Sequence, residues 1–190
     1  MDTQRFNGKY RIPSARWAAW DYANNAAYFV TICNTQRAPD FGVIQNGIME
    51  YSPLGQAAED CWSAIPEHFP FVILDEFVIM PNHVHGILII DKPDAPTPMQ
   101  TAPVETQNIA SLRQQWTGNK FGPQSQNLAS IVRGYKIGVT KFSRLNGIPF
   151  TWQARYHDRV IRNAAEYSHI SQYIQQNPQK WLQDEFHTPL

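Results

Sequence analysis

The stretch EFVIMPNHVHGILII, residues 76–90, decides how the rest of the chain is interpreted. Apolar, strand-forming residues are interrupted by Met-Pro-Asn, and the apolar run resumes around two histidines, His83 and His85. Side chains at positions i and i+2 of a strand lie on the same face of a sheet. The two imidazoles are therefore predicted to lie a few ångströms apart, with Val84 between them pointing into the core. This spacing is typical of metal ligands.

A pair of surface histidines on a half-exposed strand is the alternative interpretation, because His-x-His alone is a weak motif. Zinc would require a further Cys or His in a fixed frame. His68 and His157 are available, but no spacing indicates them. Cys33 and Cys61 form no Cys-x-x-Cys pair, and we expect them to be buried thiols in a reducing compartment.

Length and composition predict one domain over residues 1–190, since 190 residues with 43% hydrophobic content suit a single core. We expect that core at about residues 28–182, after an N-terminal extension over residues 1–25. No apolar run approaches 18 residues, and the first residues lack the apolar segment of a signal peptide. These features predict a cytoplasmic protein with no membrane partner.

Strand and turn signals organise the first half of the chain. Residues 28–34, 71–80 and 84–90 are predicted strands, because they are short, apolar and rich in β-branched residues. Asn46-Gly47 between apolar pairs predicts a small hairpin. A helix is expected from Ser52 as N-cap to Pro66 as its end. Its predicted apolar stripe comprises Leu54, Ala58, Cys61, Trp62 and Ile65.

Residues 91–125 change character, with many Pro, Gln, Thr and Asn and little periodicity, and we interpret them as an insertion or long loop with a short ordered piece around Trp116. A helix follows over residues 127–145, and Gly147 is its stop signal. One face is predicted to be apolar: Leu128, Ile131, Tyr135, Val139, Phe142 and Leu145. The opposite face carries Arg133, Lys136, Thr140 and Arg144.

A strand over residues 150–162 and a last helix complete the pattern. Asn163 as cap with Glu166 three residues later is a capping-box arrangement. Ile170, Tyr173 and Ile174 are the apolar positions of that helix. The order β-α-β-β-α-β predicts an α+β, ferredoxin-like antiparallel sheet with two helices on one face and an extra C-terminal helix.

The charge is unevenly distributed, although the formal net charge is zero. Residues 126–190 hold eight basic and four acidic residues, so the first 125 residues carry the compensating acidic excess. The basic face of the predicted helix 127–145 has no acidic residue among its cations. A neutral total can therefore conceal a surface suited to phosphate contacts, although a basic face is also what an ordinary solvated helix shows.

Three side chains of the last helix are predicted to share one face. Tyr173 and Asn177 are four residues apart, and His169 lies one turn before Tyr173. Pro178 disfavours helix at the preceding residue, so it marks the helix end or a kink. A phenol, a carboxamide and an imidazole thus line one side of this helix. The alternative is that Tyr173 is a core aromatic residue with its hydroxyl at the edge.

Three segments in this order resemble the single-tyrosine HUH transposases, and more narrowly the REP-associated tyrosine transposases, relatives of the insertion sequence 200 group. They are MPNHVHGILII (80–90), WQARYHDRVIRN (152–163) and YSHISQYIQQNPQKW (167–181), with the basic helix between the first two. HUH denotes His, a hydrophobic residue and His, here residues 83–85. The resemblance runs from about residue 28 to residue 181, and residues 91–125 are longer than the compact family core requires.

The resemblance implies the chemistry of the site. Tyr173, in a Tyr-Ile-x-x-Asn-Pro pattern, would be the nucleophile, and Asn177 would join His83 and His85 as the third ligand of Mg²⁺ or Mn²⁺. The implied reaction cleaves single-stranded DNA, forms a 5′-phosphotyrosine link and releases a 3′-hydroxyl, and its reversal joins strands. His169 or metal-bound water would assist as the base.

The implied partner is single-stranded or hairpin DNA, bound by a monomer or a homodimer. Trp152 and Tyr156 would stack on unpaired bases or belong to the core. The expected phosphate contacts are Arg133, Lys136, Arg144, Arg155, Arg159 and Arg162.

Three other functions stay open. A replication initiator or relaxase also uses an HUH site, but initiators often carry two tyrosines about a helical turn apart, whereas Tyr167 and Tyr173 are six apart. A catalytically silent DNA-binding regulator would be expected to have lost a site residue. An RNA-binding module on the same scaffold would not need His-x-His.

Overall fold

The computed structural model describes residues 20–93 and 125–187. The predicted N-terminal extension lies largely outside these residues, and so does most of the predicted insertion, Trp116 included. No helix of the described ranges combines the length and the apolar character that crossing a membrane requires.

A four-stranded antiparallel sheet forms the centre of the described structure, with the strand order β4-β5-β1-β6. Its strands are β1 (Ala26–Cys33), β4 (Val72–Ile79), β5 (His83–Ile90) and β6 (His157–Ile161). The helices are α1 (Pro53–Ser63), α2 (Ile65–His68), α4 (Leu128–Leu145) and α5 (Ala164–Gln176), followed by the 3-10 helix η2 (Pro178–Gln183). This order and connectivity confirm the predicted ferredoxin-like fold.

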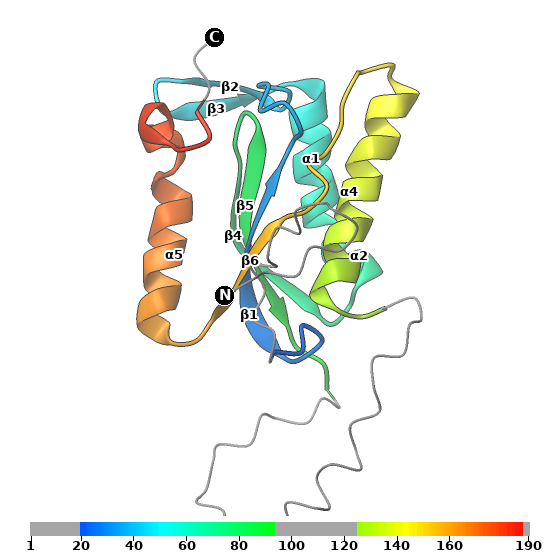
Figure 1. The fold of residues 1–190 in the computed structure, drawn as a ribbon, viewed down its shortest axis with the longest axis vertical. Helices are drawn as coiled ribbons and strands as arrows, with labels where there is room; N and C mark the ends of the chain where they lie inside the picture. The colour runs from blue at the N-terminus through cyan, green and yellow to red at the C-terminus, as the bar shows by residue number, and fades with distance from the viewer. Residues whose placement is uncertain (1–19, 94–124, 188–190) are drawn as a thin grey trace, which may run out of the picture.

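Each face of the sheet carries its own helices (Figure 1). α1 and α4 cover one face, where Trp62, Tyr135 and Val139 pack against Tyr28 and Leu88. α5 lies on the other face, where a smaller apolar cluster joins it to β5. The alternation of side chains along a strand lets β5 serve both clusters and still present its histidines on the α5 side.

Two predictions that depend only on neighbouring residues, the Asn46-Gly47 hairpin and the Ser52 cap, are confirmed. β2 (Gly42–Gln45) and β3 (Ile48–Tyr51) form the expected hairpin, and Asn46 and Gly47 adopt φ of 53° and 75°. Both values lie in the left-handed region that an Asn-Gly turn requires. The Ser52 side chain accepts a hydrogen bond from the Gly55 N–H and caps α1.

Two helix predictions are wrong in detail. Pro66 does not end α1, which stops at Ser63, but lies in the first turn of α2, where a missing N–H costs nothing. Leu145 is 76% exposed, while Ser143 is buried in the last turn of α4. At 100° per residue, position 143 lies about 40° from the buried Val139 and position 145 about 120° away.

The strand predicted over residues 150–162 is also shorter than expected. Trp152 makes only an isolated bridge with Asn34, and regular pairing starts at His157. The Lys136 ammonium donates hydrogen bonds to the carbonyls of Gln153 and Arg155, at 2.8 and 3.0 Å. These carbonyls therefore face α4 and interrupt the strand.

Gly86 follows His85 directly and is expected not to tolerate a side chain. A Cβ at this position would lie 2.2 Å from Cζ2 of the fully buried Trp62, which stacks on Phe77. Overpacking of this kind costs about 1–3 kcal/mol, so Gly86→Ala should lower the midpoint of urea unfolding. Gly134→Ala is the control, because Ala is favoured by about 1 kcal/mol inside a helix and the nearest atom to a Cβ there, Phe69 Cε2 at 3.2 Å, needs to move by only a few tenths of an ångström. Equal stability of the two variants would contradict the close approach.

Candidate metal and tyrosine site

The two histidines of β5 face each other in a buried site. His83 and His85 are 0% and 2% exposed, and their Nε2 atoms lie 3.0 Å apart. Val84, between them, packs in the core on the opposite face of the sheet. The i, i+2 geometry therefore brings the imidazoles together as the sequence predicted.

Hydrogen bonds at the other ring nitrogens set the orientation of both imidazoles. The Asn82 amide donates to the carbonyls of Arg37 and Phe186, so its Oδ1 is directed at His83 Nδ1, 2.8 Å away. That nitrogen must then carry the proton, which leaves a lone pair on Nε2. His85 Nδ1 lies 2.8 Å from the hydroxyl of Thr31. Such partners are typical of metal-binding histidines, whose Nε2 atoms they aim at the ion.

Burial keeps both imidazoles neutral at physiological pH. It lowers the pKa of His83 well below its usual range, and the nearby His85 acts in the same direction. Burial also lowers the pKa of His85, to about 3. Neutral imidazole is the form that binds a metal ion, so the site is prepared for ligation at neutral pH.

The metal-free protein is expected to lose stability as the pH falls below about 6.5, the pKa of an unfolded histidine. Between that pH and about 3, the unfolded chain binds protons that the folded His85 does not. The free energy of unfolding should therefore fall by up to about 1.4 kcal/mol per pH unit for each such histidine.

Urea unfolding in EDTA between pH 7.5 and 5 measures this dependence. In the His83→Gln, His85→Gln double variant, the free energy of unfolding should change less steeply with pH than in wild type. In His157→Gln, at an exposed position, it should change with pH as steeply as in wild type. A double variant that keeps the wild-type slope would show that these imidazoles do not cause the acid sensitivity.

Tyr173 reaches the histidines from α5. Its hydroxyl lies 3.1 Å from His85 Nε2, and its ring packs edge-on against Phe29. The side chain is 38% exposed, so Tyr173 is open to solvent, unlike the buried core residues of the same helix, Ile170 and Ile174. Burial of the hydroxyl, reinforced by the charge of Asp184, raises the pKa of Tyr173 to about 12.

α5 is fixed to β4 at two points, one on each side of Tyr173. The pairing of β4 with β5 shifts register between Leu74 and Phe77. A bulge of this kind re-aims side chains. Here Asp75 accepts a hydrogen bond from the Tyr167 hydroxyl at 2.5 Å, and Glu76 accepts one from the Gln175 amide at 2.8 Å. The helix therefore holds Tyr173 over the histidines of its own chain.

Asn177 has a buried side-chain amide with an unsatisfied oxygen. It is the C-cap of α5, keeps helical dihedral angles despite the following Pro178, and is 3% exposed. Its amide nitrogen donates to Asp184 Oδ2 at 3.2 Å, and its Oδ1 has no partner among the described residues. A buried amide oxygen without a partner is costly unless something binds it.

Asp184 is a site residue that the sequence interpretation missed. A carboxylate oxygen of Asp184 and one nitrogen of each histidine all lie within 4.8 Å of one another, a spacing that can hold a metal ion. Asp184 follows η2, which folds the chain back over the end of α5 after Pro178. The one available sequence signal was an acidic pair shortly after the Asn-Pro motif.

The other candidate histidines lie elsewhere. His169 is exposed on α5 and belongs to no described cluster of ligand atoms. His68 ends α2, and His157 is exposed at the start of β6. Within the described ranges, none of the three joins His83 and His85.

The predicted phosphate contacts fall into two groups. Arg133, Lys136 and Arg144 lie on α4, where burial lowers the pKa of Lys136 to about 8. Arg155, Arg159 and Arg162 lie along the segment that leads through β6 to α5.

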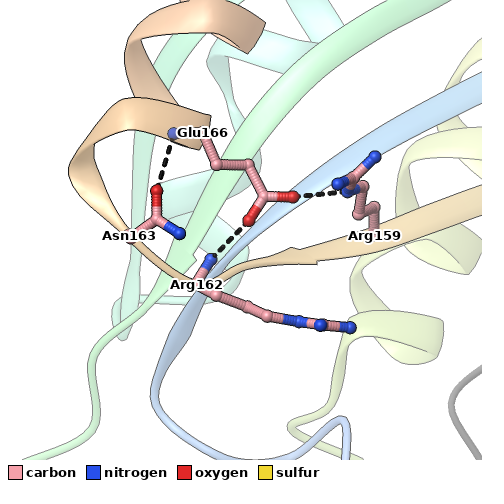
Figure 2. A network of polar contacts seen from close by, with 4 residues as sticks. All are labelled: Arg159, Arg162, Asn163 and Glu166. Carbon is pink, nitrogen blue, oxygen red and sulfur yellow. Dashed lines mark hydrogen bonds and ion pairs between the residues drawn. The ribbon is translucent and has the colours of Figure 1, made fainter.

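Glu166 ties part of this second group to the start of α5 (Figure 2). Its carboxylate pairs with Arg159 at 2.5 Å and accepts a hydrogen bond from the Arg162 backbone N–H at 3.0 Å. Asn163 caps the helix by accepting from the Glu166 N–H at 2.8 Å. The expected capping box is thus modified, because Glu166 bonds the residue before the cap instead of the cap itself.

Comparisons with known proteins agree with the fold. A REP-associated tyrosine transposase, solved bound to a REP hairpin, has a TM-score of 0.56 and 17% sequence identity, covering 88% of this chain and 74% of that one. The chain therefore has the fold of a tyrosine transposase. No protein-family model matches the sequence. An uncharacterized protein of Haemophilus influenzae is 38% identical over 191 residues, covering 98% of this chain and 99% of that protein, and the two belong to one family.

Proposed function

We propose that this chain cleaves and rejoins single-stranded DNA through a covalent 5′-phosphotyrosine link at Tyr173, as a transposase does. The observation that carries the proposal is the 3.1 Å separation of the Tyr173 hydroxyl and His85 Nε2. A partly exposed phenol lies against a pair of buried, neutral imidazoles. Such a cluster is a candidate for covalent catalysis assisted by a metal ion.

The donor set fits a divalent ion such as Mg²⁺ or Mn²⁺. His83 and His85 would supply nitrogen, and the unpartnered Oδ1 of Asn177 would supply oxygen. Asp184 would add the only charged ligand of the set, and mixed N/O donors favour Mn²⁺ over Mg²⁺ in affinity. When bound, the ion polarises a phosphoryl oxygen and offsets the charge that develops during transfer.

The proposed reaction exchanges one phosphoester bond for another. The Tyr173 oxygen attacks the scissile phosphorus in line, the bond to the 3′ oxygen breaks, and that oxygen takes up a proton while the phenol loses one. At a pKa of about 12 the phenol is largely protonated at neutral pH, and a cation at the neighbouring ligands would lower this value. Attack by the released 3′-hydroxyl, or by another one, reverses the step without ATP.

The arrangement of α5 favours one nucleophile acting within its own chain. The Tyr167 hydroxyl donates a hydrogen bond to Asp75, and at 100° per residue Tyr167 lies about 120° around the helix from Tyr173. A two-tyrosine initiator would need a second free phenol at the site. We therefore propose a monomer, or a homodimer of self-sufficient subunits, working on bacterial nucleoid DNA in the cytoplasm.

The related transposase was solved with a REP hairpin, and we propose hairpin or single-stranded DNA as the partner of this chain. The proposed DNA contacts are Arg133, Lys136, Arg144, Arg155, Arg159 and Arg162. The competing function is a catalytically silent DNA-binding regulator. Only the cleaving enzyme would form a covalent adduct with DNA, so adduct formation distinguishes the two functions.

The test uses the full chain, Mn²⁺ and oligonucleotides with a hairpin and single-stranded flanks, each labelled at one end. A denaturing gel should show a protein–DNA adduct that carries the 3′-end label and not the 5′-end label, since the tyrosine keeps the 5′ phosphate of the downstream fragment. DNA that binds and never forms an adduct, across a panel of such substrates, would favour the regulator.

A further inference from the structure

A groove runs along the outer face of α4, away from the metal and tyrosine site. It has a volume of about 740 Å³ and is lined along α4 and by the segment before β6. The residues that matter to the argument are Arg133, Lys136, Ile137, Lys141, Arg144 and Tyr156. We refer to these six as the α4 groove.

The α4 groove and Tyr173 lie on opposite sides of the sheet. α4 packs with the cluster of Tyr28 and Leu88, and α5 packs with that of Ile87 (Figure 1). A ligand in this groove therefore does not touch the described metal and tyrosine site.

The chemistry of the groove combines cations with apolar surface. Its described lining holds four basic side chains and no carboxylate. Ile137 is 60% exposed and Leu145, also in the lining, is 76% exposed. Large apolar side chains are thus exposed here among positive charges. Their exposure to water does not stabilise the fold, so this combination indicates a binding surface.

We propose that the α4 groove is a second DNA site that binds unpaired nucleotides. Arg133, Lys141 and Arg144 would contact phosphates. On a helix, Arg133 and Lys141 are separated by about 12 Å, so they would contact different phosphates of one strand. Ile137, Leu145 and the edge of Tyr156 would contact base faces. Duplex DNA hides its base faces, so the exposed apolar side chains Ile137 and Leu145 favour an unpaired strand.

β6 connects the groove with the proposed reaction site, and on this point the inference rests on the proposed function. β6 is at the edge of the four-stranded sheet. Val160 packs on the α4 side, and Ile161 packs on the α5 side. Arg159 reaches Glu166 of α5. A strand leaving the groove can thus pass this edge over basic residues before it reaches Tyr173.

Anisotropy titrations of labelled single-stranded oligonucleotides in EDTA test the groove separately from catalysis. Lys141→Gln should weaken binding about 3- to 10-fold and reduce the slope of log K against log salt by about 0.7, the value for one lost phosphate contact on a single strand. Lys180→Gln removes the same charge from an exposed position of η2 and should leave both quantities nearly unchanged. Equal effects of the two variants would overturn a specific site in the groove.

Base contact needs its own readout. A single abasic position is moved along the oligonucleotide, and wild-type binding should weaken at one or two positions. In Ile137→Ser, binding should be weaker overall and the abasic penalty at those positions should disappear. Two results would overturn binding of unpaired nucleotides. One is an abasic penalty that persists in Ile137→Ser. The other is an affinity for duplex DNA that Lys141→Gln weakens as much as it weakens the affinity for single-stranded DNA.

The outcome is distinguishable from failure of the proposed function. Suppose that no DNA forms an adduct, but Lys141→Gln changes the salt dependence and Ile137→Ser removes the abasic penalty. The DNA site in the α4 groove would then be supported and the cleavage proposal would be wrong.

Discussion

Tyr173→Phe is expected to fold, to bind DNA with nearly wild-type affinity and to form no covalent adduct. The phenolic oxygen becomes part of the product bond, so no other change at this position removes the chemistry as directly. Because the side chain is 38% exposed and its hydroxyl bonds neutral groups, His85 and Asn177, its loss should lower the free energy of unfolding by no more than about 1 kcal/mol. Denaturing gels report the adduct, and anisotropy reports binding.

Tyr167→Phe is the matched control on the same helix. It removes a hydroxyl that donates to Asp75, so it should lower the thermal midpoint more than Tyr173→Phe does. It should still form the adduct. If Tyr173→Phe forms the adduct and Tyr167→Phe does not, the nucleophile has been misassigned and the Asn-Pro motif does not identify it.

Local sequence signals were enough for the order of the sheet strands and for the pairing of the two histidines. A strand period of two residues places His83 and His85 on one face whatever surrounds them, and Asn46-Gly47 determines a turn by its own backbone preferences. The position of Tyr173 needed more than helical periodicity. Periodicity places it beside Ile170 and Ile174, and the sequence resemblance alone indicated that it faces the histidines.

The remaining features depend on contacts between segments distant in the sequence. Asp184 comes to the histidines because η2 folds back after Pro178, and no spacing rule describes that return. The strand predicted over residues 150–162 starts only at His157, and Lys136 of α4 binds the carbonyls of Gln153 and Arg155 in the segment before it. The partners that orient the imidazoles are equally non-local, since Asn82 is held by the carbonyls of Arg37 and Phe186.

His85→Ala is expected to abolish binding of Mn²⁺, and Asp184→Asn is expected to weaken it about 10- to 100-fold, in the range found when partners of a metal site are removed. His85 is central, because its Nε2 lies close to both His83 Nε2 and the Tyr173 hydroxyl. Asp184→Asn keeps the shape of the side chain and removes its charge. Titration calorimetry with the metal-free full chain measures both effects without DNA.

Glu185→Gln, at the exposed neighbour of Asp184, removes the same charge without entering the cluster of ligand atoms and should leave the affinity unchanged. Stability gives an independent readout, because a ligand at 100 times its Kd stabilises the folded state by about 2.7 kcal/mol. Mn²⁺ should therefore raise the thermal midpoint of wild type and of Glu185→Gln, and not that of His85→Ala.

If Asp184→Asn binds Mn²⁺ as tightly as wild type does, the site is completed by Asn177 Oδ1, and Asp184 only orients that amide through its hydrogen bond. If wild type binds neither Mn²⁺ nor Mg²⁺, the paired imidazoles are not a metal centre, and the cleavage chemistry proposed for Tyr173 would need a different electrophile.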